Sequence, residues 1–320
     1  MKIDVRQITY NNEQVDWVVV KNSLGLEVTL TSFGASLHKV FYKALLTHAP
    51  ENEIEFIESP SYFGKTVGRI SGRIENSVME INGTDYGFTA NEGRHCLHSG
   101  PDGLSNKNFK TEIVEGEDHV NVIFTYYSKD GEAGFPGNMT IKVTYFIKDD
   151  DNLFTITHDV VSDLDTPVNL TNHAYFSLGE EVDLSYMDLK IMASRYLTVD
   201  HELIVKENLP VIPFFDFRKG GLIKDHLAPY TNGISCIDHD FVLDQERYSP
   251  ALVMINPKLK LKLTVDTNYP ILHIYANPHK PDLLTYNALA IECKKSNIES
   301  MIVKAFEHEI FVISYRIDEI

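Results

Sequence analysis

The chain has 320 residues, of which 43% are hydrophobic and 23% charged, and this composition excludes intrinsic disorder and permits a large buried core. Its 46 Asp and Glu against 29 Lys and Arg give a formal net charge of −17, which repels a nucleic-acid backbone and an anionic membrane surface alike. The N-terminus lacks the layout of a secretory signal, and no run of about 18 apolar residues occurs. We therefore expect a cytoplasmic protein with no nucleic-acid and no membrane partner.

Alternation of apolar and polar residues, which is typical of half-buried strands, recurs along the chain. In chain order it predicts strands at 16–20, 26–31, 119–127, 259–265 and 306–317. A hairpin is predicted around Asn82-Gly83, because both residues tolerate the positive φ of a tight turn. A second hairpin is predicted over 139–161, around the polar cluster 149–152.

Helical periodicity is limited to short candidates at 59–65 and 222–227. This disfavours alternating strands and helices and a nucleotide-binding parallel sheet, and it favours an all-β sandwich. No internal repeat, low-complexity tract or linker divides the sequence, so we expect one domain over residues 1–320. The stretch 207–237, which contains prolines and Gly220-Gly221, is predicted to be a long loop at the rim of the fold.

The cysteines, Cys96, Cys236 and Cys293, are odd in number and lack metal-type spacing. We therefore expect buried thiols rather than a disulfide framework or a zinc cluster. The run 238–240 reads Asp-His-Asp, but the calcium-loop pattern and its closing glutamate are missing, so no metal site is expected.

Two histidines lie in distinctive segments. His173, in LTNHAYFSL, is placed on a strand or just beyond its end, where a structural and a catalytic role are both open. Its neighbours Asn172, Tyr175 and Phe176 would suit a pyranose pocket. His98 is predicted to lie at a junction of loop and strand, and the same two interpretations apply to it.

Arg69 and Arg73 are four residues apart, so in an extended segment they would point to the same face. A solvated surface, a phosphate clamp and a donor fork for a neutral sugar are all compatible with that spacing. Asp238 could accept hydrogen bonds from sugar hydroxyls or cap its own turn.

Glu292 follows an apolar run that predicts a buried strand. A buried glutamate needs a reason, and a general base would be one. The alternative is an exposed strand end beside Lys294 and Lys295.

Together these segments, in this order, resemble the aldose 1-epimerase family, also called galactose mutarotases, from about residue 25 to the C-terminus. The family segments usually read GRYANRI, N-G-x-N-x-LHGG, LTNHSYFNL, DHNFVL and LE. The counterparts here read GRISGRI, NEGRHCLHSG, LTNHAYFSL, DHDFVL and IE. The resemblance implies a large antiparallel β-supersandwich that binds a small-molecule sugar, and we expect a monomer or homodimer without cofactor or metal.

The resemblance implies that Glu292 takes the proton from the anomeric hydroxyl and that His173 protonates the ring oxygen. The counterparts Arg73, His98 and Asp238 would hold the hydroxyls and the ring in place. The implied activity is interconversion of the α and β anomers of a free aldohexose, such as galactose or glucose.

Departures from the family pattern bear on which aldose is bound. His273 stands at a sugar-binding position where the family commonly has a glutamine. Gly72 replaces an asparagine, and Ser99 replaces the first glycine of LHGG. The acid and the base are unchanged.

Two alternatives share the implied fold. A hexose-6-phosphate 1-epimerase would need a cationic pocket, which Arg69, Arg73 and Arg94 could supply. A non-catalytic sugar-binding protein would have lost the chemistry, and the retention of Glu292 and His173 argues against it.

Overall fold

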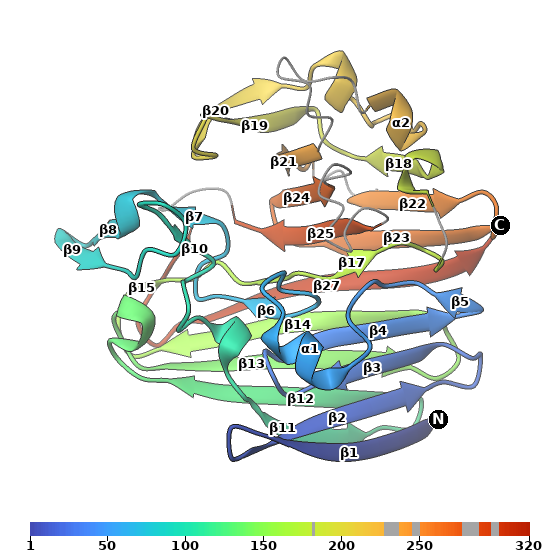
Figure 1. Cartoon of the computed structure of the whole chain (residues 1–320), viewed down its shortest axis with the longest axis horizontal. Coiled ribbons are helices and arrows are strands. Elements are labelled where there is room, and N and C mark those ends of the chain that lie inside the picture. The colour runs from blue at the N-terminus through green and yellow to red at the C-terminus, as the bar shows by residue number, and fades with distance from the viewer. Residues whose placement is uncertain (181–182, 227–236, 245–249, 277–287, 296–300) are drawn as a thin grey trace.

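The structure is a computed structural model that describes residues 1–180, 183–226, 237–244, 250–276, 288–295 and 301–320. Three sheets make up most of it, and every pairing between their strands is antiparallel within these ranges (Figure 1). The first sheet contains, in spatial order, β1 (Lys2–Tyr10), β2 (Glu13–Lys21), β3 (Glu27–Thr31), β4 (Ser36–Tyr42) and β5 (Ala44–Leu45).

The two larger sheets combine strands that are far apart in the sequence. The eight-stranded sheet contains, in spatial order, β11 (Lys110–Glu115), β12 (His119–Ser128), β13 (Met139–Lys148), β14 (Leu153–Ser162), β27 (His308–Glu319), β23 (Leu261–Thr267), β22 (Leu252–Asn256) and β18 (Asp188–Ile191). The six-stranded sheet contains β17 (Tyr175–Phe176), β25 (Leu289–Lys294), β24 (Ile271–Ala276), β21 (Ile237–Val242), β19 (Arg195–Val199) and β20 (Val205–Pro210).

Short ribbons, α-helices and single-turn 3₁₀ helices complete the described elements. The ribbons pair β6 (Thr66–Val67) with β16 (Thr171–Asn172), β7 (Arg73–Ile74) with β10 (Cys96–Leu97), β8 (Val78–Ile81) with β9 (Thr84–Gly87), and β15 (Thr166–Pro167) with β26 (Ile302–Val303). The α-helices are α1 (Glu53–Glu58) and α2 (Ile223–His226). No helix in the described ranges has the length and apolar character that crossing a membrane requires.

One hydrophobic core joins the three sheets. On β13 every second residue, from Met139 to Ile147, is buried, because successive side chains of a strand point to opposite faces. Val28 of β3, Val143 of β13 and Leu272 of β24 belong to the same buried cluster. The eight-stranded sheet thus packs against both smaller sheets, and the predicted antiparallel all-β sandwich is confirmed (Figure 1).

Most predicted strands and both hairpins are confirmed. The pairing Ile81↔Thr84 places Asn82 and Gly83 in a two-residue turn, with φ of 50° and 80°. The strand predicted at 259–265 begins only at Leu261, because Lys260, at φ 56°, lies in a turn and Leu259 is exposed.

Two local predictions need correction. The helix expected at 59–65 lies earlier, at α1, where the Asn52 side chain accepts hydrogen bonds from the N–H groups of Ile54 and Glu55. Pro60 disfavours helix at Ser59, whose backbone is extended. The expected rim loop 207–237 begins inside edge strand β20 and includes α2, while 227–236 lie outside the described residues.

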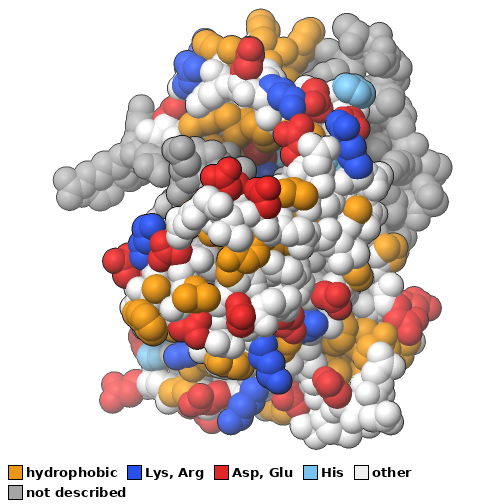
Figure 2. All heavy atoms as spheres, turned by 90° about the vertical axis from the view of Figure 1, so that its left-hand side faces the viewer, with side chains coloured by type: hydrophobic (Ala, Val, Ile, Leu, Met, Phe, Trp, Pro, Cys, Tyr) orange, Lys and Arg blue, Asp and Glu red, His pale blue; other side chains and the backbone are white. Residues whose placement is uncertain are grey.

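Charges are mixed on the face of the molecule that carries β8 and β9. Figure 2 shows acidic side chains scattered over this face with Lys and Arg among them, so the described side chains there form no single basic patch. Such a face lacks the concentrated positive charge with which proteins hold a phosphate backbone.

Candidate active site

Glu292 and His173 meet at the edge of the six-stranded sheet. His173 follows β16, Glu292 lies within β25, and their exposed fractions are 5% and 3%. The Nε2 atom of His173 is 3.3 Å from Oε1 of Glu292. A carboxylate and an imidazole from segments more than a hundred residues apart are therefore held in direct contact. The alternative of an exposed strand end for Glu292 is wrong.

The His173 imidazole lies among aromatic rings. Its centroid is 5.1 Å from that of Tyr175, 5.9 Å from that of Tyr62 and 5.5 Å from that of His98. Burial lowers the pKa of His173, although the charge of Glu292 acts in the opposite direction. In the described part of the chain, the buried Nδ1 atom has no hydrogen-bond partner.

The backbone around His173 is anchored by Gly64. The Gly64 N–H donates to the carbonyl of His173 at 2.8 Å, and the Gly64 carbonyl accepts from the N–H of Leu37 on β4 at 2.9 Å. A Cβ at Gly64 would lie 1.8 Å from the carbonyl oxygen of Leu37, and its φ is +59°. Only glycine allows this close approach.

Two neighbours of His173 do not face it as predicted. Asn172 is fully buried, and its Nδ2 donates to the Gly64 carbonyl at 2.7 Å and to the Tyr145 hydroxyl at 3.3 Å. Phe176 stacks on Tyr315 in the main core. The reason is the alternation along β17, which turns Tyr175 toward His173 and Phe176 away from it.

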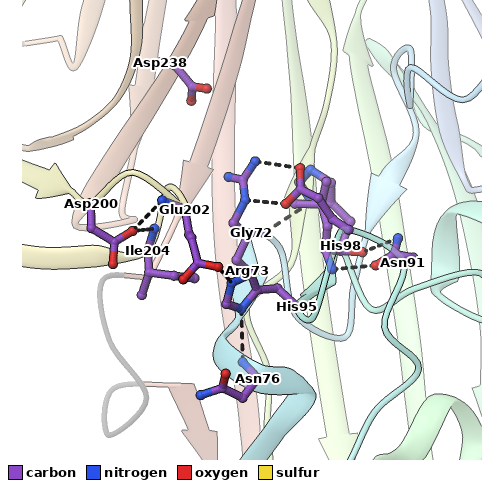
Figure 3. Close-up of polar contacts among 12 residues, drawn as sticks. Gly72, Arg73, Asn76, Asn91, His95, His98, Asp200, Glu202, Ile204 and Asp238 are labelled. Atoms are coloured by element: carbon purple, nitrogen blue, oxygen red, sulfur yellow. Dashed lines mark hydrogen bonds and ion pairs between the residues drawn. The ribbon is translucent and has the colours of Figure 1, made fainter.

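His98 follows β10 directly, as the junction prediction requires. Its Nδ1 accepts a hydrogen bond from the backbone N–H of Gly72 at 3.2 Å, and burial holds its pKa well below its usual value. The neutral ring therefore carries its proton on Nε2 and can donate from that atom. Figure 3 shows His98 beside Gly72 and Arg73.

Arg73 lies on β7 and forms a bidentate pair with Glu92. The distances are 2.5 Å from Nε to Oε2 and 2.9 Å from Nη2 to Oε1. The charge of Arg73 also reaches Asp238, since it helps to lower the pKa of that carboxyl group. Sequence reasoning missed Glu92 as the partner of Arg73.

Arg69 does not share the face of Arg73. It is 2% exposed, and its guanidinium donates to the carbonyls of Pro136 and Gly137, both at 2.9 Å, and to the Ser128 hydroxyl at 2.8 Å. The segment is not a continuous strand, because Gly72 has φ +81°. Both the solvated surface and the phosphate clamp are therefore wrong for Arg69, which instead anchors turns.

Asp238 and His273 lie on the same face of the six-stranded sheet as Glu292. Asp238 lies within β21 rather than in a turn, and its Oδ1 is 3.3 Å from Nε2 of His273 on β24. Burial raises the pKa of Asp238, but the hydrogen bond and charge of His273 and the charge of Arg73 lower it overall. Nε2 of His273 is also 3.9 Å from Oε1 of Glu292. The structure thus brings Arg73, His98, His173, Asp238, His273 and Glu292 into one neighbourhood.

Two charged residues of this neighbourhood were not predicted. Asp240 accepts from Nδ1 of His273 at 2.7 Å, and Lys294 Nζ lies 2.7 Å from the same carboxylate. The signal was present in the sequence, because residues two apart on a strand share a face and Asp238 and Glu292 were already candidates. By contrast, Asp244 accepts from the Ser194 hydroxyl at 2.6 Å and does not contact His273.

The remaining candidates have structural roles. The Ser99 hydroxyl accepts from the N–H of Ile70 at 2.8 Å and donates to its carbonyl at 3.0 Å, so this departure ties backbone together. Burial raises the pKa of Cys96 to about 11 and of Cys293 to about 12, and both are free thiols. Cys236 lies outside the described residues. In the described ranges, no group of three His, Cys, Asp or Glu is arranged to hold a metal ion.

Comparison with known proteins gives a consistent result. A family described as aldose 1-epimerase matches residues 16–308. An aldose 1-epimerase of Haemophilus influenzae is 31% identical over 283 residues, which cover 84% of this chain and 81% of that protein. A maltose epimerase of Levilactobacillus brevis is 26% identical, with 89% and 88% of the two chains covered. The crystal structure of a galactose 1-epimerase from Lactobacillus acidophilus matches 99% of both chains with a TM-score of 0.90, at 24% identity.

Proposed function

The chain belongs to the aldose 1-epimerase family, and on that premise we propose that it interconverts the α and β anomers of a free aldose by opening and closing the pyranose ring. The observation that carries the proposal is the 3.3 Å contact between the buried Glu292 carboxylate and the His173 imidazole. O1 and O5 of a pyranose are bonded to the same carbon, so a base for O1 and an acid for O5 have to lie close together.

In the proposed reaction, Glu292 accepts the proton of the O1 hydroxyl while His173 donates a proton to O5. The C1–O5 bond breaks, the carbonyl forms at C1, and rotation about C1–C2 followed by closure gives the other anomer. The proton transfers then run in reverse, so protons and electrons balance without a redox step. General acid and general base catalysis each contribute about 10²–10⁴-fold, or roughly 3–5 kcal/mol.

The other polar groups suit a neutral, hydroxyl-rich ligand. The neutral His98 has an Nε2–H to donate, Asp238 accepts, and Arg73 and His273 donate. We propose that these four side chains orient the sugar. Tyr62 and Tyr175 lie beside His173, where their rings can contact the C–H groups of the sugar.

A hexose 6-phosphate is less well supported as the substrate. Each of the three arginines considered for the phosphate already has partners: carbonyls for Arg69, Glu92 for Arg73, and Glu202 for Arg94 at 2.5 Å. A phosphate at Arg73 or Arg94 would therefore compete with a carboxylate that already neutralises the guanidinium.

The test compares the rate of anomer exchange for a set of pure sugars. The rate is measured by polarimetry and by NMR exchange. We expect acceleration with glucose, galactose or maltose, less with glucose 6-phosphate, and none with methyl glucoside, which lacks the O1 proton. Maltose is included because a relative is named as a maltose epimerase. Measurable binding of free aldoses without any acceleration would instead support a sugar-binding protein.

A further inference from the structure

A row of charged side chains crosses three strands of the six-stranded sheet. Asp240 of β21 is paired in register with His273 of β24, which is paired with Glu292 of β25. Directly opposite residues of neighbouring strands point to the same face. Lys294 and Asp238 share this face because each is two residues from a member of the row.

The contacts of His273 favour a charged ring. Its Nδ1 is 2.7 Å from Oδ1 of Asp240, and its Nε2 is 3.3 Å from Oδ1 of Asp238 and 3.9 Å from Oε1 of Glu292. An ionised carboxylate only accepts hydrogen bonds, so hydrogen bonds to Asp240 and Asp238 together need a proton on each ring nitrogen. Only the imidazolium has an N–H on each nitrogen.

Lys294 keeps Asp240 ionised inside the protein. Asp240 is 6% exposed, and a buried carboxylate is costly unless it is paired. Although burial acts in the opposite direction, Lys294 and His273 hold the pKa of Asp240 well below its usual range. Burial and Lys294 lower the pKa of His273, but its bonds to Asp238 and Asp240 and the charge of Glu292 outweigh them and raise it to about 9.

Three departures from the family segments meet at this cluster. Asp240 stands at the asparagine of DHNFVL, His273 at a glutamine, and Gly72 at the asparagine of GRYANRI. The Nζ atom of Lys294 is 3.8 Å from the position of a Cβ on Gly72. A Cβ at position 72 would thus be in ordinary van der Waals contact with the ammonium, so Gly72 lies beside the same cluster.

We propose that Asp240, which its contact with Lys294 keeps ionised, is a positioning residue that holds His273 as an imidazolium between Asp238 and Glu292. The pocket then presents a charged donor where the family segments have a neutral amide. Deprotonation of His273 would leave the carboxylates of Asp238 and Glu292 without the cation between them, and their repulsion would disturb the sugar pocket. Among the described residues, Arg73, His98, His173, Tyr175 and Tyr275 are further titratable or charged groups around this cluster, and His239 is next to it on β21.

The charge state is tested by NMR of the full chain with ¹⁵N- and ¹³C-labelled histidine, with the His273→Gln variant used for assignment. We expect both ring nitrogens of His273 to be protonated at neutral pH and the ring to titrate near pH 9. Asp240→Asn should move the midpoint down by roughly 1–3 units, because an opposite charge in contact is lost. Asp244→Asn is the matched control, since Asp244 contacts Ser194 instead, and should leave the midpoint unchanged. A midpoint near 6.5, or an unchanged midpoint in Asp240→Asn, overturns the proposal.

The consequence for catalysis rests on the proposed function and has its own readout. After subtraction of the uncatalysed rate, kcat/KM of the wild type should fall above about pH 9, and this fall should come at lower pH in Asp240→Asn. In His273→Gln it should disappear, because glutamine does not titrate. If kcat/KM of His273→Gln fell at high pH in the same way as that of the wild type, the positioning role would be contradicted. An inactive wild type would refute the proposed function, while the NMR titration would still decide the charge of His273.

Discussion

Replacement of Glu292 by glutamine tests the proposed chemistry most directly. Glutamine has nearly the same shape, so it can occupy the 3%-exposed site on β25 and still lie beside His173. Its amide cannot take a proton from O1 at neutral pH. We expect kcat to fall by about 10²–10⁴-fold, which is roughly 3–5 kcal/mol in the barrier. KM should change less, because the groups proposed to orient the sugar remain.

The assay is the change in optical rotation of freshly dissolved α-D-glucose, with exchange by NMR at equilibrium as a second measurement. Glu112→Gln, on edge strand β11, is the matched control because it removes one exposed carboxylate from a sheet that does not contain β25. Far-UV circular dichroism and thermal unfolding should be similar for both variants. A wild-type rate in folded Glu292→Gln would remove Glu292 from the mechanism.

Three further predictions concern stability. Arg69→Met should lower the free energy of unfolding by about 3 kcal/mol, measured with urea, because buried carbonyls lose their donor. Gly64→Ala should lower the free energy of unfolding by about 4 kcal/mol or more, since its Cβ would lie 1.8 Å from the Leu37 carbonyl oxygen. Gly87→Ala is the control and should be tolerated, because its Cβ meets nothing within 4 Å. Equal melting temperatures for the two variants would refute this prediction. Burial lowers the pKa of His158 to about 4 from 6.5, so the unfolded chain binds the proton first and stability falls as pH drops from 6.5 toward 4, by roughly 3 kcal/mol. His158→Gln should flatten this dependence, and an unchanged slope would contradict it.

The local parts of the fold could be read from the sequence because they depend on neighbours in the chain. The period of two on β13 and the Asn82-Gly83 turn need only a strand and a tight turn to form. Element ends were less predictable: α1 lies before the expected helix because of its cap at Asn52. The single domain, the cytoplasmic location and the monomer or homodimer remain predictions.

By itself, the sequence determined the strand patterns, the family resemblance and the identity of the candidate acid and base. Only the tertiary structure decided which neighbours face them: Arg69 points to buried carbonyls, Asn172 to Gly64, and Asp240 to His273. The physical reason is that register between strands far apart in the chain sets these contacts, and a local pattern does not encode that register. The chemical type of a side chain is known from the local sequence, whereas its partners and its charge state depend on the strands that pack beside it.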